Sequence, residues 1–366
     1  MPKLGGERNS VQNPIIGYVS ESSAEYTTSD NKKILARLGW EYLSPADALK
    51  SRGNETNLVL RDTFKKQILN LNPFITEDIA EELIKKIESL PPNIEGSLQS
   101  WEYLSGLRTV FVPGEKREKN VRFIDEDIEK NISQVTDEFS FTNGIKTNRY
   151  DIVFFINGIP FLFVETKAAH KIDGISEALE QVKRYHLETP EAMALFQIYV
   201  ITHIIRFYYS ATWNWSEKNL FNWKTESKAK NFEELVKTFF DRERITKALL
   251  HFILFTRQDD ELKKVVLRPH QMRAVAKIIE RAKDKTKNRG LIWHTQGSGK
   301  TYTMITVAKR IIEDPYFENP TVLMIVDRNE LESQLFSNLK SVGFEIDESR
   351  IARSKRHLRE LLQSDT

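Results

Sequence analysis

The chain has 366 residues, and its 54 lysines and arginines nearly balance its 52 aspartates and glutamates. The net charge of +2 excludes a globally basic surface, so any contact with nucleic acid must come from local patches. The sequence contains no cysteine, which excludes disulfides and thiolate-bound zinc and is typical of a reducing compartment. The N-terminus has no apolar signal core and no apolar run could cross a bilayer, so we expect a cytoplasmic protein without membrane contact.

The length predicts two domains, with a boundary near residue 258 where the pattern of elements changes. We expect residues 1–258 to form the first domain and residues 259–366 to begin the second. Within the first domain, residues 31–39 are expected to form a short helix, followed by a strand at Trp40–Leu43. Thr76 is a plausible N-cap of a helix with apolar residues at helical spacing.

The stretch "RYDIVFFINGIPFLFVETKAAH" predicts two apolar strands, Asp151–Ile156 and Phe161–Lys167, around an Asn-Gly turn. Strand residues alternate between faces, so Glu165 and Lys167 point the same way, and Asp151 begins the partner strand at the same sheet edge. Two close carboxylates repel unless a cation lies between them, and Mg²⁺ would resolve this and polarise a phosphodiester. Lys167 could then orient or activate the attacking water. The alternative is a surface cluster with an ordinary Glu–Lys pair.

The helix predicted next, "ISEALEQVKRYH", carries Gln181 and Tyr185 on one face, because they are four residues apart. Both are candidate residues of the same site.

After residue 258 the pattern becomes a strict alternation, with strands at 290–293 and 321–326 and a helix at 301–312, which predicts a parallel sheet. The stretch "LIWHTQGSGKT" fits a phosphate-binding loop, except that His294 replaces the first glycine. Backbone N–H groups and the helix N-terminus would cradle the phosphates of ATP, Lys300 would reach the β and γ phosphates, and Thr301 would bind Mg²⁺. The candidate nucleotide-binding residues are Gln271, Thr295, Gln296, Gly297, Ser298, Gly299, Lys300 and Thr301.

Several further residues are weaker candidates. Gln271 lies in "RPHQ", and its amide offers the donor and acceptor pair that matches the edge of adenine. Asp327 ends an apolar strand and could be an acidic ATPase residue, although no acidic pair follows it. Trp213, Trp215 and Trp223 could stack on bases, but packing in the core is the simpler interpretation. Three basic segments, "RDTFKKQ", "AKDKTKNR" and "RIARSKRHLRE", are interpreted as solvated helix faces rather than DNA-binding patches.

Taken together, "YD", "ETK" and the Gln-x-x-x-Tyr pair resemble the PD-(D/E)xK nuclease core found in the restriction (R) subunits of type I restriction enzymes and in RecB-like nucleases. The usual proline before Asp151 is replaced by Tyr150, and the acidic residue that the family's first helix provides is not evident, with Glu25 a weak candidate. The segments "RLGWEYLSP", "LNPFITEDIAEELI", "WHTQGSGKT" and "VDRNELESQL" resemble successive segments of type I R subunits over essentially the whole chain.

The resemblance implies an α/β protein, in which a restriction-endonuclease-like mixed sheet flanked by helices precedes part of a RecA-like parallel α/β P-loop domain. It implies an ATP- and Mg²⁺-dependent type I site-specific deoxyribonuclease that cleaves and translocates double-stranded DNA with methyltransferase and specificity subunits. Asp151, Glu165, Lys167, Gln181 and Tyr185 would be its nuclease residues. In the family, the acidic ATPase motif and second motor lobe follow the segments seen here, so we interpret the chain as an N-terminal fragment without a complete ATPase. The alternatives are a repair nuclease-helicase and a nucleotide- and DNA-binding fragment without activity of its own.

Overall fold

We describe the fold from a computed structural model. It describes residues 8–27, 33–168, 174–204, 206–223, 231–258, 261–287, 289–326, 329–342 and 351–364. The chain divides into two compact units, the first comprising Met1–Leu254 and Lys263–Met272 and the second Phe255–Leu262 and Arg273–Thr366. The expected boundary near residue 258 lies within Phe255–Leu262, which is assigned to the second unit before the chain returns to the first at Lys263.

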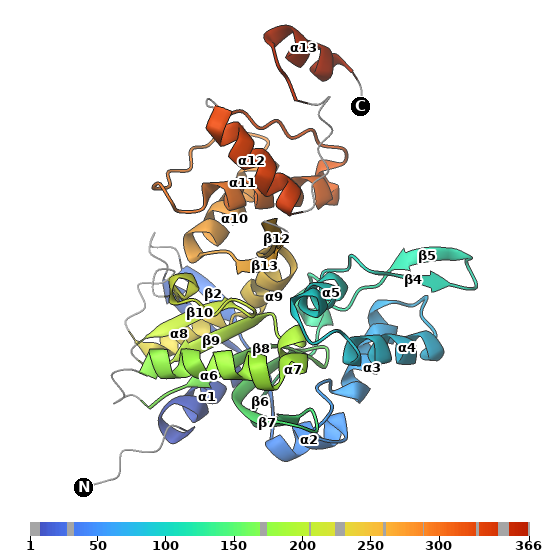
Figure 1. Cartoon of the computed structure of the whole chain (residues 1–366), viewed down its shortest axis with the longest axis vertical. Helices are drawn as coiled ribbons and strands as arrows, with labels where there is room; N and C mark the ends of the chain where they lie inside the picture. Colours follow the sequence, from blue (N-terminus) through green and yellow to red (C-terminus); the bar gives the residue numbers. More distant parts are fainter. Residues whose placement is uncertain are drawn as a thin grey trace. The chain divides into compact units, whose positions relative to one another are not determined.

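The first unit is built on a mixed sheet of seven described strands, ordered β11-β10-β9-β8-β7-β6-β3 (Figure 1). Neighbours in this order run antiparallel except for β8 with β9 and β3 with β6, which are parallel. The strands are β3 (Glu41–Leu43), β6 (Ser133–Thr142), β7 (Thr147–Ile156), β8 (Ile159–Thr166), β9 (Ile198–Thr202), β10 (Phe207–Ala211) and β11 (Phe221–Asn222). The predicted mixed sheet is therefore confirmed for this unit.

Helices pack around this sheet, with α6 against β7, β8 and β9 and α7 against β8. The N-cap predicted at Thr76 is confirmed, because its side chain accepts a hydrogen bond from the backbone N–H of Ile79. The helices of this unit are α1 (Asn13–Ser20), α2 (Pro45–Arg52), α3 (Arg61–Leu71), α4 (Glu77–Glu88), α5 (Ile94–Leu104), α6 (Gly174–Glu188), α7 (Pro190–Leu195), α8 (Phe232–Phe239) and α9 (Arg242–His251). Short helical turns are η1 (Arg8–Gln12), η2 (Ile128–Lys130) and η3 (Glu217–Asn219).

Two further two-stranded ribbons belong to this unit, β1 (Ser23–Thr27) with β2 (Lys33–Arg37) and β4 (Thr109–Val112) with β5 (Arg117–Asn120). The helix expected over residues 31–39 was therefore wrong, because Lys33–Arg37 forms a strand. Its residues pair antiparallel with β1, from Ser23 opposite Arg37 to Thr27 opposite Lys33. A strand partner earlier in the chain thus overrides the local helical preference.

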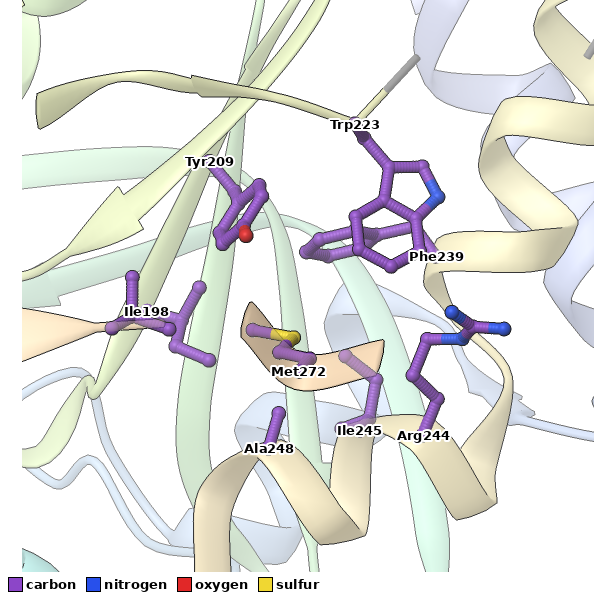
Figure 2. Close-up of a pocket in the computed structure, with 9 residues that line it drawn as sticks. Ile198, Tyr209, Trp223, Phe239, Arg244, Ile245, Ala248 and Met272 are labelled. Atoms are coloured by element: carbon purple, nitrogen blue, oxygen red, sulfur yellow. The ribbon is translucent and has the colours of Figure 1, made fainter. Parts of the chain in front are cut away.

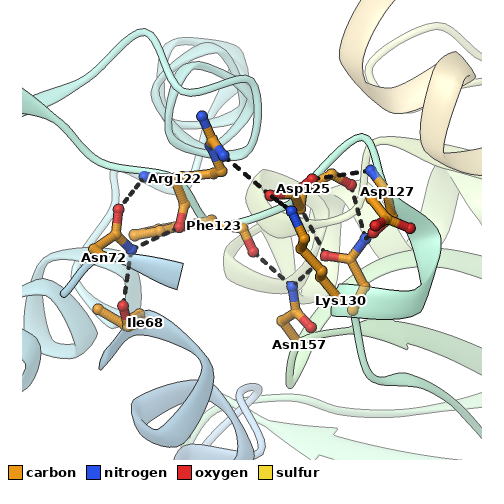
Figure 3. Close-up of polar contacts among 9 residues, drawn as sticks. Ile68, Asn72, Arg122, Phe123, Asp125, Asp127, Lys130 and Asn157 are labelled. Atoms are coloured by element: carbon orange, nitrogen blue, oxygen red, sulfur yellow. Dashed lines mark hydrogen bonds and ion pairs between the residues drawn. The ribbon is translucent and has the colours of Figure 1, made fainter. Parts of the chain in front are cut away.

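The predicted hairpin between β7 and β8 is confirmed, with its turn at Asn157 and Gly158. Both turn residues have positive φ, 52° and 81°, which a tight two-residue hairpin turn requires. Asn157 is buried, and its side chain donates to the carbonyl of Phe123 (Figure 3). The same amide donates to Oδ1 of Asn131 and accepts from the backbone N of Ile132. The hairpin is thereby fixed to the 121–132 segment as well as to its neighbouring strands.

The pairing of β7 with β8 contains an irregularity. Ile156 lies opposite Ile159 and Phe155 opposite Pro160, but Phe154 lies opposite Leu162, so Phe161 is an extra residue on β8. From Phe154 towards Asp151, each residue of β7 is therefore paired with a β8 residue one position later than in a regular hairpin.

The second unit contains α11 (Lys300–Glu313), the short turn η5 (Pro315–Phe317), α12 (Asn329–Ser341) and α13 (Lys355–Gln363). Ile305 of α11 packs with Leu335 and Leu339 of α12. Three elements are divided between the two units: β12 (Ile253–Gln258), β13 (Glu261–Val266) and α10 (Pro269–Lys283).

The strands expected at 290–293 and 321–326 do not form in the described residues, and this prediction was wrong for the structure. Their apolar side chains are largely exposed, with Leu291 at 84%, Trp293 at 85% and Ile325 at 78%. A strand is stabilised by hydrogen bonds to a neighbour and by a covered face, and neither segment pairs with a described strand.

Candidate functional site

Glu165 lies near the end of β8 that is distant from the hairpin turn, whereas Asp151 lies in the middle of β7, because β7 begins at Thr147 and not at Asp151 as expected. Ile152 is opposite Val164, so the same register carried one residue further brings Asp151 beside Glu165. Residues opposite one another in an antiparallel pair share a face of the sheet. The side chains of both are almost fully buried, with residue exposures of 6% for Asp151 and 0% for Glu165.

Asp151 is held by Thr166, the residue between Glu165 and Lys167. Its Oδ2 accepts hydrogen bonds from the backbone N of Thr166 at 2.7 Å and from Oγ1 of Thr166 at 2.8 Å. These two bonds fix the orientation of one carboxylate oxygen.

Lys167 is the cation of the site. Its Nζ lies 2.5 Å from Oε1 of Glu165 and donates to the carbonyl of Thr166 at 2.9 Å. Burial, followed by the neighbouring charge of Asp151, raises the pKa of Glu165 to about 8, although Lys167 acts in the opposite direction. The surface-cluster alternative is excluded by this burial, since Lys167 is only 7% exposed.

Gln181 and Tyr185 of α6 complete the network. Oε1 of Gln181 accepts from Nζ of Lys167 at 3.1 Å, and its Nε2 donates to the hydroxyl of Tyr185 at 2.5 Å. That hydroxyl lies 3.0 Å from Oε2 of Glu165. Burial, and then Glu165, raises the pKa of Tyr185 well above its usual value, so the phenol keeps its proton as a donor. All five residues expected at a nuclease site therefore lie in one connected cluster.

The donor set suits a hard divalent cation. Asp151 and Glu165 supply carboxylate oxygens, and burial, followed by the charge of Asp151, raises the pKa of Glu165, so a nearby cation would favour its ionised form. Among the described residues no group of three or more acidic or histidine side chains could hold a metal ion. Mg²⁺ is nevertheless commonly bound through one or two carboxylates while it keeps several waters.

Two contributors to this site were missed in the sequence. Thr166 carries no motif signal beyond its place between Glu165 and Lys167. Gln12, at the end of η1, donates from Nε2 to Oγ1 of Thr166 at 3.3 Å. Glu25, the weak candidate for a further acid, lies instead on β1 and is exposed.

The predicted phosphate-binding loop lies in the second unit, between residues 294 and 301. Gly297 and Gly299 have positive φ of 72° and 80°, and α11 begins directly after them at Lys300. Nζ of Lys300 donates to the carbonyls of His294 and Thr295 at 3.2 and 2.9 Å. Ser298 Oγ donates to the carbonyl of Thr295 at 2.7 Å. The loop therefore curls around a lysine ammonium at a helix N-terminus, which is the arrangement that binds phosphates.

The remaining nucleotide candidates are less informative. Thr295 and Gln296 are exposed, and Thr301, in the first turn of α11, is half-buried. Gln271 is 3% exposed, and its Oε1 accepts from the backbone N of Arg268 at 2.8 Å. Asp327 lies outside the described residues.

The tryptophans considered for base stacking serve largely in packing. Trp223 is 2% exposed and, with Tyr209 and Phe239, lines an apolar pocket beside β9 and α9 (Figure 2). Trp213 donates from Nε1 to the carbonyl of Met193, and its backbone N donates to Nε2 of His186. Trp215, at 36% exposure, contacts the ring of His186. In the basic segment on α3, Lys65 pairs with Glu77 and Glu81 of α4.

None of the described helices is long and apolar enough to cross a membrane.

Comparison with known proteins gives two family matches. Residues 23–218 match the family described as type I restriction enzyme R protein N terminus, and residues 270–366 match the SWI2/SNF2 ATPase family. The first match covers more than half of the 366 residues and includes all five residues of the buried cluster.

Individual relatives agree with the first match. A Methanocaldococcus jannaschii protein, named as the endonuclease subunit of a proposed type I restriction enzyme MjaVIIP, is 33% identical over 251 residues, or 64% of this chain and 23% of its own length. A second protein from that organism, named in the same way for MjaVIIIP, is 30% identical over 326 residues, or 84% of this chain and 31% of its own. The type I restriction enzyme SsaAORF53P endonuclease subunit of Staphylococcus saprophyticus is 31% identical over 210 residues, or 56% of this chain and 22% of its own.

The aligned regions thus span between about a fifth and a third of each relative's length. With its buried Asp-Glu-Lys cluster and its match over residues 23–218, the chain belongs to the family of type I restriction enzyme R proteins.

Proposed function

We propose that the first unit cleaves double-stranded DNA by metal-dependent hydrolysis of phosphodiesters, as the nuclease part of a type I restriction R subunit. The observation that carries this proposal is the buried cluster of Asp151, Glu165 and Lys167, formed where β8 ends beside β7 in the middle of the sheet order. Charged groups are rarely buried in an apolar sheet without a function, and strongly shifted pKa values mark candidate functional sites.

Each residue has a role that its contacts support. Asp151 and Glu165 would hold Mg²⁺, which when bound supplies polarisation of the scissile phosphate and activation of a water molecule. Lys167 offers the cation that orients the attacking water and offsets charge in the transition state. Gln181 and Tyr185 hold Lys167 and Glu165 in position through their hydrogen bonds.

The experiment is cleavage of supercoiled plasmid with Mg²⁺ or Mn²⁺ by the wild type and by Asp151→Ala, Glu165→Ala and Lys167→Ala. We expect each substitution to abolish cutting while the fold, followed by circular dichroism, is retained. Glu180→Ala is the matched control, because Glu180 is an exposed carboxylate one residue before Gln181. Cutting by Lys167→Ala at the wild-type rate would contradict the assignment.

The same comparison is to be run with the full-length subunit together with its methyltransferase and specificity partners, which we propose as the complex in which cleavage occurs. Plasmid cleavage that occurs in this complex but not with the chain alone would indicate a nuclease that requires its motor and partners. An inactive wild type in both settings would favour the alternative of a DNA- and nucleotide-binding chain. The family match over residues 23–218 favours restriction over repair.

We further propose that the second unit binds ATP with Mg²⁺ and belongs to a RecA-like, DNA-translocating motor. The curled loop around Lys300 and the match of residues 270–366 to SWI2/SNF2 ATPases support this. Lys300→Ala is expected to abolish binding of a fluorescent ATP analogue, whereas Lys309→Ala, further along α11 where Lys309 pairs with Glu313, is the control. If Lys300→Ala bound the ATP analogue as tightly as the wild type, the proposed nucleotide site would be contradicted.

A further inference from the structure

Gln12 is buried beside the nuclease cluster although it lies 154 residues before Thr166 in the sequence. It ends η1 and is 3% exposed, and its Nε2 lies 3.3 Å from Oγ1 of Thr166. Thr166 in turn bonds to Asp151, so Gln12 is one hydrogen bond removed from a candidate metal ligand.

The hydrogen bonds fix which way the Gln12 amide points. The hydroxyl of Thr166 has a single proton, and it donates that proton to Oδ2 of Asp151 at 2.8 Å. Its oxygen can therefore only accept from Gln12, which requires the NH₂ group rather than the carbonyl oxygen of the amide to face Thr166. Oε1 of Gln12 is then the remaining polar atom, and it is buried without a hydrogen-bond partner among the residues that the structure describes.

A buried acceptor without a partner destabilises the folded protein, and a leucine of similar size would avoid this cost. Such unsatisfied groups in folded proteins commonly mark a functional role or a site for water or an ion. Here the unpaired oxygen belongs to a side chain that already touches the cluster.

The segment that carries Gln12 is anchored to the central sheet. Arg8, one turn earlier, pairs with Asp137 of β6 at 2.6 Å, and the hydroxyl of Tyr42 donates to the same carboxylate at 2.8 Å. Asp137 is 1% exposed and lies opposite Ile152, next to Asp151. The position of Gln12 is therefore set through β6, which pairs with β7, and through its own contact with Thr166 of β8.

We propose that Gln12 is a positioning residue of the nuclease centre, which orients Asp151 through Thr166 and accepts, at Oε1, a hydrogen bond from a water bound to the divalent cation. This inference rests on the proposed nuclease function. Outer partners of metal ligands commonly contribute 10- to 100-fold to metal affinity or activity.

The test is Mn²⁺ binding to the whole chain without DNA, measured by isothermal titration calorimetry, together with the melting temperature of the metal-free protein. Gln12→Leu removes both amide contacts while retaining an apolar side chain of similar size. Gln12→Glu keeps an acceptor oxygen near the Oε1 position. Asn13→Ala is the control, because Asn13 is exposed and its side chain donates to Oδ1 of Asn9, away from Thr166 in the network.

We expect Gln12→Leu to weaken Mn²⁺ binding about tenfold, with an unchanged or higher metal-free melting temperature. In plasmid cleavage it should raise the Mn²⁺ concentration for half-maximal rate more than it lowers the rate at saturating metal. Gln12→Glu keeps the acceptor but loses the donor to Thr166, so its Mn²⁺ affinity should exceed that of Gln12→Leu. A purely structural role would instead lower the melting temperature and leave the Mn²⁺ affinity of the folded protein unchanged.

Wild-type Mn²⁺ affinity in Gln12→Leu would overturn the role of Gln12 and leave the nuclease proposal intact. If the wild type binds Mn²⁺ no more tightly than Asp151→Asn does, the nuclease proposal and this inference are overturned together.

Discussion

Thr166 holds Asp151 by two hydrogen bonds from a single residue, one from the backbone N and one from Oγ1, both to Oδ2. Thr166→Val keeps the shape and the backbone bond but removes the hydroxyl. Because Asp151 then loses one of the two donors that Thr166 supplies, we expect Mn²⁺ affinity to fall by roughly tenfold, as for other partners of metal ligands. Thr166→Ser should restore it. Equal calorimetric affinities for the valine variant and the wild type would contradict this.

Glu165 should make the stability of the protein depend on pH in the neutral to alkaline range. Its pKa is about 8 in the folded state against an ordinary value of 4.5, so the folded protein keeps a proton that the unfolded chain releases. The free energy of unfolding therefore falls as pH rises between these two values.

Glu165→Gln removes this titration. Without metal, we expect the variant to become progressively more stable than the wild type from pH 5 to pH 9 in urea unfolding, even though it no longer cuts DNA. Glu180→Gln, at an exposed position, should follow the wild type at every pH. Parallel stability profiles for wild type and Glu165→Gln would show that Glu165 is charged throughout.

Gly158 tolerates no side chain at the hairpin turn. A Cβ there would lie 2.6 Å from the carbonyl oxygen of Leu60 and 2.8 Å from the backbone N of Phe64, at a φ of 81°. We expect Gly158→Ala to lower the free energy of unfolding by more than about 2 kcal/mol, because neither backbone atom can move without displacing α3.

Gly144→Ala separates the two causes of the lost stability, which are the contact of the new Cβ with Leu60 and Phe64 and the strain of a positive φ. Gly144 has a similar φ of 87° but nothing within 4 Å of its Cβ position. Its substitution should cost only the backbone strain, about 1 kcal/mol. Equal losses for the two variants in chemical denaturation would show that the contact with α3 contributes nothing.

His186 should make the protein sensitive to mild acid. It is 4% exposed, with Nδ1 bonded to the carbonyl of Val182 and Nε2 accepting from Trp213, and burial lowers its pKa from 6.5 to about 4. The unfolded chain binds the proton first, so stability is lost as pH falls from about 6.5 towards 4. Between pH 7 and 4.5 the loss from this group is about 2 kcal/mol.

The measurement is urea unfolding at both pH values for the wild type and His186→Gln. The variant should lose less stability on acidification, whatever its stability at pH 7. An identical loss in both proteins would show that His186 does not contribute to acid sensitivity.

The parts of the first unit that could be predicted from sequence are those set by local chemistry. The Asn157-Gly158 turn, the cap at Thr76 and the shared face of Glu165 and Lys167 follow from neighbouring residues. The strand β2 and the contact of Gln12 with Thr166 depend on partners distant along the chain, which periodicity does not reveal. The expected strands of the second unit have the composition of buried strands but no described partner.

The bulge at Phe161 decides whether Asp151 and Glu165 face the same side of the sheet, because one residue more or less on β8 reverses the face of every residue beyond it. In a regular hairpin closed at Ile156 and Ile159, Asp151 would be level with Val164, and Glu165 would point to the other side of the sheet. The single extra residue reverses this and brings both acids to one side. Removing one residue from the bulge would thus leave a well-formed hairpin with an apolar interior but without the two acids on one side that the candidate metal site needs. The number of residues in β8 is therefore constrained by the site, and the side chains of the strand alone do not show this.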